Sequence, residues 1–292
     1  MISIFGSANM DLVAYTPMAP KLGETVTGRS FATVPGGKGA NQAIAAARAS
    51  GTGAAFIGAV GDDAFGPALR ASLEDAGVDV SRLRVVPGSS GIAHIVVDDD
   101  GGNSIIVIPG ANGTVTGPTP EDLDVIARSD ALLLQLELPM DAVVAAARAA
   151  TVPVVLTPAP ARELPAELLD AVTLIVPNEH EAAAITGRTD PGEALEALLE
   201  LVPEAVITLG ARGAVYGSRA GERLSVPAVP VQAVDTTAAG DAFAGALAVA
   251  RAEGRPSPEA LRFAATAAAL SVRRPGAGTS MPSRAEIDAA LR

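Results

Sequence analysis

The hydrophobic residues of the chain fall into short, continuously apolar segments that alternate with longer segments of helical character. Strands are expected at 2–5, 54–60, 131–136, 152–156, 172–176 and 205–209, and helices at 40–49, 63–76, 140–150, 179–186, 192–201 and 258–272. Strands that are apolar throughout are typical of a parallel sheet with helices on both faces. The pattern therefore predicts an α/β fold with an open, mostly parallel sheet flanked by helices.

Three segments interrupt this alternation. Thr25–Val34, Gly91–Asp98 and Asn103–Ile108 alternate polar and β-branched residues without a helical period, as half-exposed strands do. The last two are joined by Asp98–Gly102, which has the composition of a hairpin turn. We expect a small β-sheet that projects from the α/β core over its strand ends and acts as a lid.

Length and composition limit the possible classes of protein. A chain of 292 residues that is 49% apolar and has no repeat or linker is expected to form one domain over 1–292, with lid strands inserted at about 12–34 and 90–110. It has no uncharged apolar stretch of about eighteen residues and enters a strand at once, so neither a membrane span nor a standard secretion signal is expected. It also has no cysteine, which favours a cytoplasmic location.

The charge and the aromatic content argue against nucleic acid as a partner. The formal net charge is −12, and the aromatic residues are two tyrosines and six phenylalanines. Phosphate backbones need a basic surface, and single strands need stacking side chains. Two histidines without cysteine also make a zinc site of the usual kind improbable. A small anionic ligand remains possible where local dipoles, a lysine and a metal ion reverse the field.

The stretch Gln232–Ala246 carries the strongest chemical signal. It begins like a strand end, continues with two threonines and small residues, and becomes an alanine-rich helix from Ala242 onward. Small residues at a strand-to-helix turn let backbone N–H groups converge, and the helix N-terminus adds positive partial charge, which makes an anion site. Asp241 in the first helical turn would then be a base for a nucleophile that approaches a phosphate. The alternative is a helix cap after a tight turn.

Polar residues near other strand ends suggest a sugar site. Asn9 and Asp11 follow the first strand, and Glu137 follows the strand at 131–136. Lys38 and Asn41 lie in a glycine-rich helix entry and offer several hydrogen-bond donors, which suits sugar hydroxyls. The spacing of this entry matches neither a P-loop nor a dinucleotide-binding fingerprint. An Asx turn and an ordinary helix entry are the alternatives.

Two further segments could bind a nucleotide. Asn178 and Glu181 share one face of a helix start and could hold a hydrated Mg²⁺ near phosphates, although acidic residues favour a helix N-terminus in any case. The turn Thr208–Gly213 suits nucleotide phosphates or, equally, a hairpin.

Five motifs in one order resemble the ribokinase branch of the PfkB-type carbohydrate kinases, and the resemblance runs from residue 4 to about residue 288. The motifs are Gly6–Asp11, Gly23–Gly28, Gly36–Gln42, Pro158–Pro165 and Asp235–Asp241. Ala238, where the wider family has a glycine, favours the ribokinase branch. The resemblance implies an open α/β sheet with a β-lid that commonly pairs with a second lid, and therefore a homodimer.

The resemblance also implies roles for individual residues. Asp241 matches the catalytic base. Sugar contacts match Asn9, Asp11, Gly37, Lys38, Gly39, Asn41, Glu137 and Asp241. The anion hole matches Ala238, Ala239 and Gly240, and the other ATP contacts match Asn178, Thr208, Leu209, Gly210, Ala211, Arg212 and Gly213. Glu181 matches a residue that organises Mg²⁺ through water. A K⁺ site matches Asp235, Thr237, Ser271, Arg274, Gly276 and Ser280.

The implied reaction is ATP-dependent phosphorylation of the 5-hydroxyl of D-ribose, which gives D-ribose 5-phosphate and ADP. Asn9 and Asp11 favour a small polyol, but they leave deoxyribose, fructose or a nucleoside open as acceptor. A non-catalytic sugar sensor is the alternative from another class, and the presence of Asp241 argues against it.

Overall fold

The computed structural model describes residues 1–292, which form two β-sheets and ten α-helices. The main sheet comprises β1 (Ile2–Phe5), β4 (Ala54–Gly61), β5 (Val78–Val86), β8 (Ala131–Leu134), β9 (Val154–Leu156), β10 (Leu174–Ile175), β11 (Glu204–Thr208), β12 (Ala214–Ser218) and β13 (Arg223–Val226). The second sheet comprises β2 (Asn9–Tyr15), β3 (Ser30–Gly36), β6 (Gly91–Val97) and β7 (Asn103–Ile108). The helices are α1 (Lys38–Ala49), α2 (Gly66–Asp75), α3 (Pro120–Ala127), α4 (Met140–Ala149), α5 (Ala166–Leu169), α6 (Glu179–Thr186), α7 (Pro191–Leu201), α8 (Ala239–Ala252), α9 (Ser257–Ser271) and α10 (Arg284–Ala290), with short 3-10 helices η1 (Gly110–Thr114), η2 (Gly210–Arg212) and η3 (Gly278–Ser280).

The main sheet has the strand order β13-β12-β11-β10-β9-β8-β1-β4-β5. The strands from β5 to β11 are parallel, and the β12–β13 hairpin extends the sheet in antiparallel fashion. The first strand lies between β8 and β4, so the strand order changes direction beside it. Ligands of open α/β sheets bind at such a switch point, beyond the carboxyl ends of the strands.

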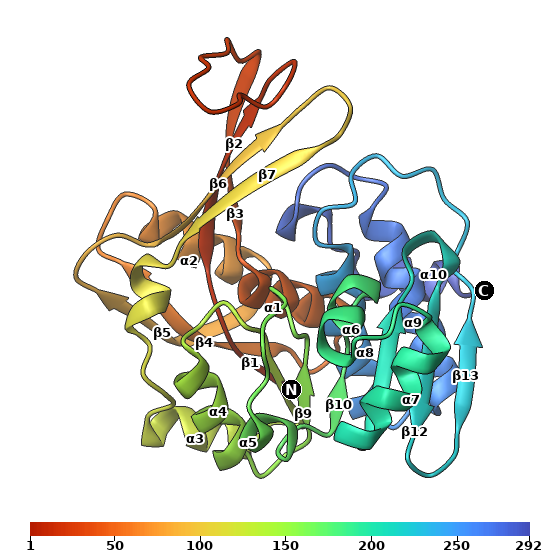
Figure 1. Cartoon of the computed structure of the whole chain (residues 1–292). Coiled ribbons are helices and arrows are strands. Elements are labelled where there is room, and N and C mark those ends of the chain that lie inside the picture. The colour runs from red at the N-terminus through yellow and green to blue at the C-terminus, as the bar shows by residue number, and fades with distance from the viewer.

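The helices cover both faces of the main sheet, as Figure 1 shows. One core packs α1, α2, α8, α9 and α10 against the sheet, and a second core packs α3 to α7 against the other face. Alanines let α1 and α8 approach closely. A Cβ atom at Gly245 would lie 2.8 Å from both the Ala45 Cβ atom and the Gln42 carbonyl oxygen, so glycine at this position permits the approach. The first turns of the two helices are thereby brought together. The predicted fold class is confirmed.

The four-stranded sheet, with the order β3-β2-β6-β7, projects upward from the main sheet in Figure 1. At its base Asn9 of β2 pairs with Gly36 of β3 and with Gly91 of β6. The edge strand β7 is exposed along its whole length. We refer to this sheet as the lid sheet.

Two expectations about elements are wrong. Residues 232–235 form no strand, since Val231 and Val234 are exposed and the Val234 backbone N–H donates instead to the Val272 carbonyl oxygen at 2.7 Å. The lid strand expected at Thr25–Val34 begins only at Ser30, opposite Tyr15, because the partner strand ends there.

Apart from the short 3-10 helices, six elements were not anticipated, namely the helices α3 and α5 and the strands β2, β5, β12 and β13. The strand β5 lies at the edge of the main sheet and alternates buried and exposed residues, so Asp79, Arg82 and Arg84 interrupt its apolar pattern. At the other edge, β13 is only partly buried. Edge strands carry polar residues that central strands exclude, which hides them from a search for apolar runs.

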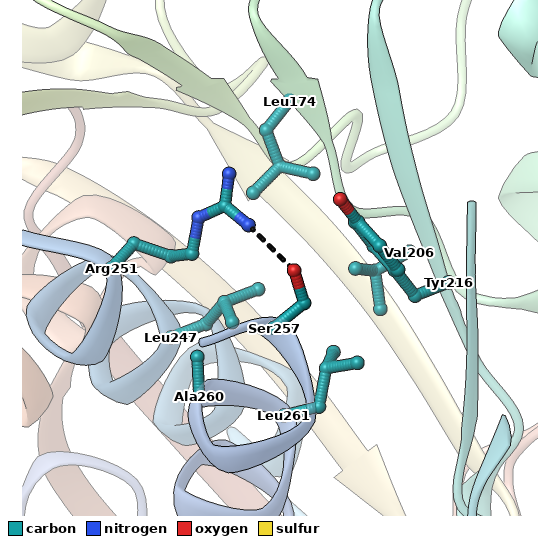
Figure 2. A pocket seen from close by; sticks show the side chains of 8 residues that line it. All are labelled: Leu174, Val206, Tyr216, Leu247, Arg251, Ser257, Ala260 and Leu261. Atoms are coloured by element: carbon teal, nitrogen blue, oxygen red, sulfur yellow. Dashed lines mark hydrogen bonds between the residues drawn. The ribbon is translucent and has the colours of Figure 1, made fainter. Parts of the chain in front are cut away.

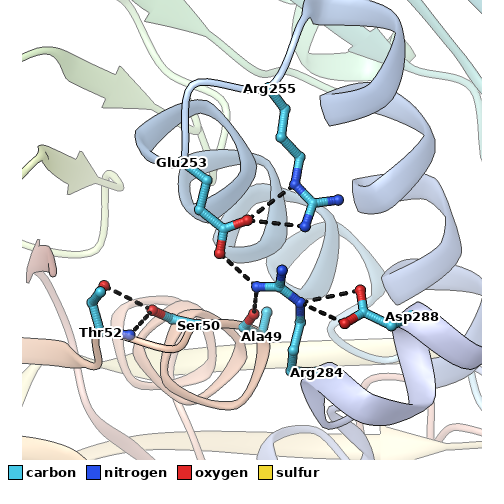
Figure 3. Close-up of polar contacts among 7 residues, drawn as sticks. All are labelled: Ala49, Ser50, Thr52, Glu253, Arg255, Arg284 and Asp288. Atoms are coloured by element: carbon cyan, nitrogen blue, oxygen red, sulfur yellow. Dashed lines mark hydrogen bonds and ion pairs between the residues drawn. The ribbon is translucent and has the colours of Figure 1, made fainter.

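The C-terminal helix α10 is fixed to the rest of the molecule by Arg284 (Figure 3). Its guanidinium donates to Glu253 after α8, to Asp288 in α10 and, at 3.2 Å, to the carbonyl oxygen of Ala49 in α1. The guanidinium carbon of Arg284 also lies 5.2 Å from the centre of the Phe263 ring, and that of Arg255 lies 4.4 Å from the same centre. No helix of the structure has the length and apolar character that a membrane span requires.

Candidate active site

A cavity of about 200 Å³ opens where β9, β10 and β11 end and α1, α6 and α8 begin. Its lining consists of Lys38, Thr157, Ala159, Val176, Asn178, Glu181, Thr208, Thr236, Ala238, Ala239, Gly240 and Asp241. Lys38 and Asp241 therefore share one hollow, although they come from different helices. A carboxylate beside a positive charge in one cavity is what a base needs to deprotonate a hydroxyl group that receives a phosphoryl group.

The first turn of α8 presents unpaired backbone donors to this cavity. The N–H groups of Gly240 and Asp241 donate to no acceptor in the protein, whereas that of Ala239 donates to the Thr236 carbonyl oxygen at 3.3 Å. Ala238 precedes the helix with φ 59° and ψ 16°, and it is the sole residue other than glycine with a positive φ. A left-handed conformation outside glycine costs about 1–2 kcal/mol. Such strain in a cavity wall that can bind an anion is typical of a functional site.

Both carboxylate oxygens of Asp241 accept hydrogen bonds from side-chain amides of α1. Asn41 Nδ2 lies 3.1 Å from Asp241 Oδ2, and Gln42 Nε2 lies 2.9 Å from Oδ1. Burial raises the pKa of Asp241 to about 6, while Lys38 and the two amide donors act in the opposite direction. A carboxylate of this pKa is ionised at neutral pH and still basic enough to accept a proton during a reaction.

Lys38 is the positive charge of the site. Burial alone would lower the pKa of its ammonium group, but Asp241, Glu137, Glu181 and Asp11 together raise the pKa above its usual value. The lysine therefore stays charged because the four charges that act on it are all acidic.

Glu137 connects three segments of the predicted sugar site. Its Oε2 atom accepts hydrogen bonds from the Ser7 hydroxyl, from Asn9 Nδ2 at 3.3 Å and from the backbone N–H of Lys38 at 3.0 Å. The Asn9 side chain is oriented from its other end by Asn112 of η1, whose Nδ2 atom donates to Asn9 Oδ1 at 2.7 Å. The residues predicted from separate strand ends are thus held in one network.

Asp11 lies on β2 at the base of the lid sheet, beside Gly36. A Cβ atom at Gly36 would lie 2.4 Å from Asp11 Oδ2, so the carboxylate occupies space that glycine leaves free. Burial, together with the charge of Glu137, raises the pKa of Asp11 to about 7, and Lys38 opposes this shift.

Gly37 and Gly39 allow the start of α1 to lie directly against the turn after β1. Gly37 has φ 92°, and a Cβ atom there would lie 2.7 Å from the Asn9 backbone nitrogen. A Cβ atom at Gly39 would lie 2.5 Å from the backbone nitrogen of Ser7. The glycines thus act through backbone packing, which places the Lys38 and Asn9 donors on the same Glu137 oxygen.

The predicted monovalent-cation residues lie around Asp235, which joins two loops. Its carboxylate accepts from the Thr237 backbone N–H at 2.9 Å and from the Gly276 N–H at 2.8 Å. Burial would raise the pKa of Asp235, but these hydrogen bonds outweigh it and lower the pKa. The carbonyl oxygens of Asp235, Arg274 and Gly276 accept no hydrogen bond in the protein.

Three side chains of this set are engaged elsewhere. The buried hydroxyls of Ser271 and Ser280 each donate to a backbone carbonyl oxygen, of Ala268 and of Ala277, at 2.8 Å. The Arg274 guanidinium pairs with Glu286 of α10. These residues can therefore offer a cation backbone oxygens or hydroxyl lone pairs.

Asn178 and Glu181, which are predicted to lie near the nucleotide, cap α6 reciprocally. The Asn178 Oδ1 atom accepts from the Glu181 N–H, and Glu181 Oε2 accepts from the Asn178 N–H, each at 2.9 Å. Burial raises the pKa of Glu181. The structure holds no group of three or more His, Cys, Asp or Glu side chains that could bind a metal ion directly.

Only the first residue of the segment Thr208–Gly213 lines the cavity. Thr208 lines it and forms a parallel bridge with Asn178. Leu209, Gly210, Ala211, Arg212 and Gly213 do not line the cavity. They form the η2 connection of the β11–β12 hairpin, where Arg212 pairs with Glu179. The segment thus forms a hairpin connection, and Gly210, Ala211 and Arg212 are exposed while Leu209 and Gly213 are half-buried. Its contact with a nucleotide stays a prediction.

The family follows from comparison with known proteins. A family model described as "pfkB family carbohydrate kinase" matches residues 1–284. The chain belongs to this family.

Individual relatives resemble the chain over almost their whole length. The ribokinase of Bacillus subtilis is 44% identical over 296 residues, which cover 99% of this chain and 99% of the relative. A deoxyribokinase of Salmonella typhi is 36% identical over 97% of this chain and 95% of its own length. The solved structure of Arabidopsis thaliana ribokinase complexed with ribose and ATP has a TM-score of 0.93 and 35% identity, and it covers 100% of this chain and 98% of that one.

Five polar residues of this PfkB-family site were given no role from the sequence, namely Ser7, Gln42, Asn112, Gln135 and Thr157. All five are buried and contact a predicted site residue or one another. Gln42 and Ser7 lie within the quoted motifs, and Thr157 directly follows the strand expected at 152–156, which is the signal that identified Glu137. Gln135 was hidden inside the strand expected at 131–136, which ends at Leu134 in the structure.

A second hollow, between β10–β12 and the helices α8 and α9, is not a site. Figure 2 shows Arg251, Ser257 and Tyr216 facing one another across it. It leaves no room for a water molecule, and Arg251 and Tyr216 are satisfied by Glu204 at 2.7 Å.

Proposed function

We propose that the protein is a ribokinase, which transfers the terminal phosphoryl group of ATP to the 5-hydroxyl of D-ribose and yields D-ribose 5-phosphate and ADP. The observation that carries this proposal is the position of Asp241, a buried carboxylate in one cavity with Lys38 and the free N–H groups of α8. Relatives named ribokinase match the chain from end to end and support the choice of ribose.

Asp241 is the proposed base. It would take the proton of the ribose 5-hydroxyl as the oxygen of that hydroxyl forms a bond to the γ-phosphorus and the bond to ADP breaks. The N–H groups at Ala238, Ala239 and Gly240 would donate to the phosphoryl oxygens, and those of Ala238 and Gly240 have no acceptor within the protein. Catalysis then rests on alignment and charge stabilisation, and the base contributes about 10²–10⁴-fold.

The sugar would lie between the lid sheet and the start of α1. Asn9, Asp11 and Glu137 offer acceptors, and Lys38 and Asn41 offer donors, for the hydroxyls that do not react. Gly37 and Gly39 would contribute backbone contacts in the same turn.

ATP would enter from the side of α6, where Asn178, Glu181 and Thr208 line the cavity. The residues present fit Mg²⁺ only through water and the nucleotide phosphates, because no cluster of carboxylates is available and Glu181 already caps α6. Mg²⁺ held in this way supplies charge neutralisation at the phosphates. The hairpin Leu209–Gly213 would approach the nucleotide from the rim.

The loops joined by Asp235 fit a monovalent cation such as K⁺. The free carbonyl oxygens of Asp235, Arg274 and Gly276 are the neutral oxygen donors that such an ion needs, next to a single carboxylate. Thr237, Ser271 and Ser280 complete the proposed set. The charge of the ion would hold the loop that leads into α8.

A homodimer through the lid sheet is proposed from the exposure of β7. Ile105, Ile106, Val107 and Ile108 are 39–67% exposed in succession, and Phe31 on the other edge strand is 63% exposed. Four adjacent exposed apolar residues on an edge strand are a surface that monomers avoid.

The test is ADP release in the presence of D-ribose, ATP and Mg²⁺, with deoxyribose, fructose and a nucleoside assayed alongside. We expect the largest kcat/KM with ribose. A larger value with deoxyribose would assign the protein to the activity of its deoxyribokinase relative, and no ADP release with any acceptor would favour a sugar sensor.

A further inference from the structure

A chain of buried amides runs from the main sheet to the proposed base. Gln135, directly after β8, and Gln42, in α1, are each 1% exposed. Gln135 Nε2 donates to Gln42 Oε1 at 2.6 Å, and Gln42 Nε2 donates to Asp241 Oδ1 at 2.9 Å. Gln135 thus reaches Asp241 through one intermediate residue and does not touch it.

These contacts fix the orientation of the Gln42 amide completely. Its second Nε2 hydrogen is directed at Thr157 Oγ1 at 2.9 Å, and the Thr157 hydroxyl donates in turn to the Leu134 carbonyl oxygen at 3.3 Å. If the amide rotated by half a turn, its oxygen would face the carboxylate and its NH₂ group would face the NH₂ group of Gln135. Both contacts would be repulsive, so the donor from Gln135 selects the same orientation as the carboxylate does.

The remaining atom of Gln135 argues against a purely structural role. Gln135 Oε1 is buried and has no hydrogen-bond partner, and it lies where a side chain at Gly6 would otherwise be, 2.1 Å from an ideal Cβ position. An unsatisfied buried acceptor destabilises the folded state, whereas an apolar side chain of the same shape would not. Stability alone would therefore favour an apolar residue at position 135.

We infer that Gln135 is a positioning residue for the reaction, which holds the Gln42 amide in the one orientation that donates a hydrogen bond to Asp241. A donor to the charged form of a carboxylate favours that form. The base is thereby kept ionised at neutral pH in a site where burial favours protonation. The charged groups around it are Lys38 and Glu137, with Asp11 and Glu181 farther away, and Gln135 makes no hydrogen bond to any of them.

The inference rests on the proposed function, and Gln135→Met tests it because methionine keeps the volume but has no donor. We expect the acidic limb of kcat/KM to move to higher pH by up to about one unit, since a lost hydrogen bond of about 0.5–1.5 kcal/mol corresponds to a shift of that size. The KM for ribose and the free energy of unfolding should change little. Gln42→Met should shift the limb in the same direction, and the double variant should shift it no further, because both changes remove one interaction.

Ser3→Ala is the matched control, because Ser3 is buried in the neighbouring strand β1 and loses a hydrogen bond to Ser129 without any link to Asp241. It should lower stability and leave the limb in place. A carbon-13 NMR titration of the Asp241 carboxyl group in the free protein gives the same comparison without turnover. Were Gln135→Met to leave that titration unchanged, or Ser3→Ala to shift it equally, the role of Gln135 would be disproved. Absence of kinase activity with a shifted titration would instead contradict only the proposed function.

Discussion

The side-chain amide of Asn41 donates a 3.1 Å hydrogen bond to the carboxylate of Asp241, a residue 200 positions later in the chain. The contact depends on the close approach of α1 and α8, which the small side chains of both helices permit. It joins the helix that carries Lys38 to the helix that carries the base. The site therefore exists only when these two helices are packed, and its chemistry can be tested one contact at a time.

The pH dependence of kcat/KM should reveal the two carboxylates whose pKa values are raised, Asp241 and Asp11. Burial raises the pKa of Asp241 to about 6 and that of Asp11 to about 7, and each must be ionised, one to accept a proton and the other to accept sugar hydroxyls. Activity should therefore be lost as the pH falls through 7 and 6, with a limiting slope of two protons. Asp11→Asn should leave a limb of one proton near pH 6. A wild-type limb near pH 4 would show that neither carboxylate is perturbed in solution.

Ala238 offers a test of strain at the entrance to α8. Glycine would relieve a left-handed conformation that costs about 1–2 kcal/mol, but it adds about 0.5–1 kcal/mol of backbone entropy to the cost of folding. Ala238→Gly should therefore raise the free energy of unfolding by no more than about 1.5 kcal/mol, whereas Ala238→Val should lower it. Urea denaturation measures both variants. Equal stability of the valine and glycine variants would contradict the φ of 59°.

Asp235 should couple the late loop to the anion hole. Asp235→Asn keeps the shape but removes the charge, so that one of the two backbone donors, from Thr237 or Gly276, faces a neutral oxygen and the other faces an NH₂ group. A hydrogen bond to a charged group contributes about 1.5–3 kcal/mol, so kcat should fall by about tenfold or more and the K⁺ concentration for half-activation should rise. Replacing K⁺ by choline should lower wild-type activity. Indifference of the wild type to the cation would remove Asp235 and its partners from the mechanism.

The proposed dimer should dissociate when a charge is placed on the apolar edge strand of the lid sheet. Ile106, 67% exposed on β7, is the centre of that surface, and Ile106→Asp should convert a dimer into monomers in analytical ultracentrifugation. Val85→Asp is the control, since Val85 is 58% exposed on β5 of the main sheet. A wild-type monomer at micromolar concentration, or dissociation of both variants, would argue against assembly through the lid sheet.

The main sheet was predictable from the sequence because its central strands are apolar throughout and its helices carry clear periods. The edge strand β5 was missed because Arg82 and Arg84 interrupt its apolar run. Both are only half-buried, which is possible at the edge of the sheet but not in a central strand. The start of the stretch Gln232–Ala246 was interpreted as a strand end because it is apolar and Val234 is β-branched, although Val234 is exposed. Local pattern cannot tell an apolar residue of the core from one left on a loop.

The candidate site was predictable where a residue follows a strand or lies in a motif, as for Asn9, Glu137 and Asp241. The partners that orient these residues were not predictable, because their roles depend on contacts between distant segments. Asn112 reaches Asn9 from η1, and Gln135 reaches Asp241 only through Gln42. The spacing of residues along the sequence does not predict which distant side chains come into contact.

The most direct measurement is the turnover of Asp241→Asn with saturating ribose, ATP and Mg²⁺, alongside calorimetric binding of ribose and of ATP. The variant keeps the size of the side chain and loses the base, so kcat should fall at least about a hundredfold while both ligands still bind. A kcat close to that of the wild type would show that another group accepts the proton, and the proposed role of Asp241 would be wrong.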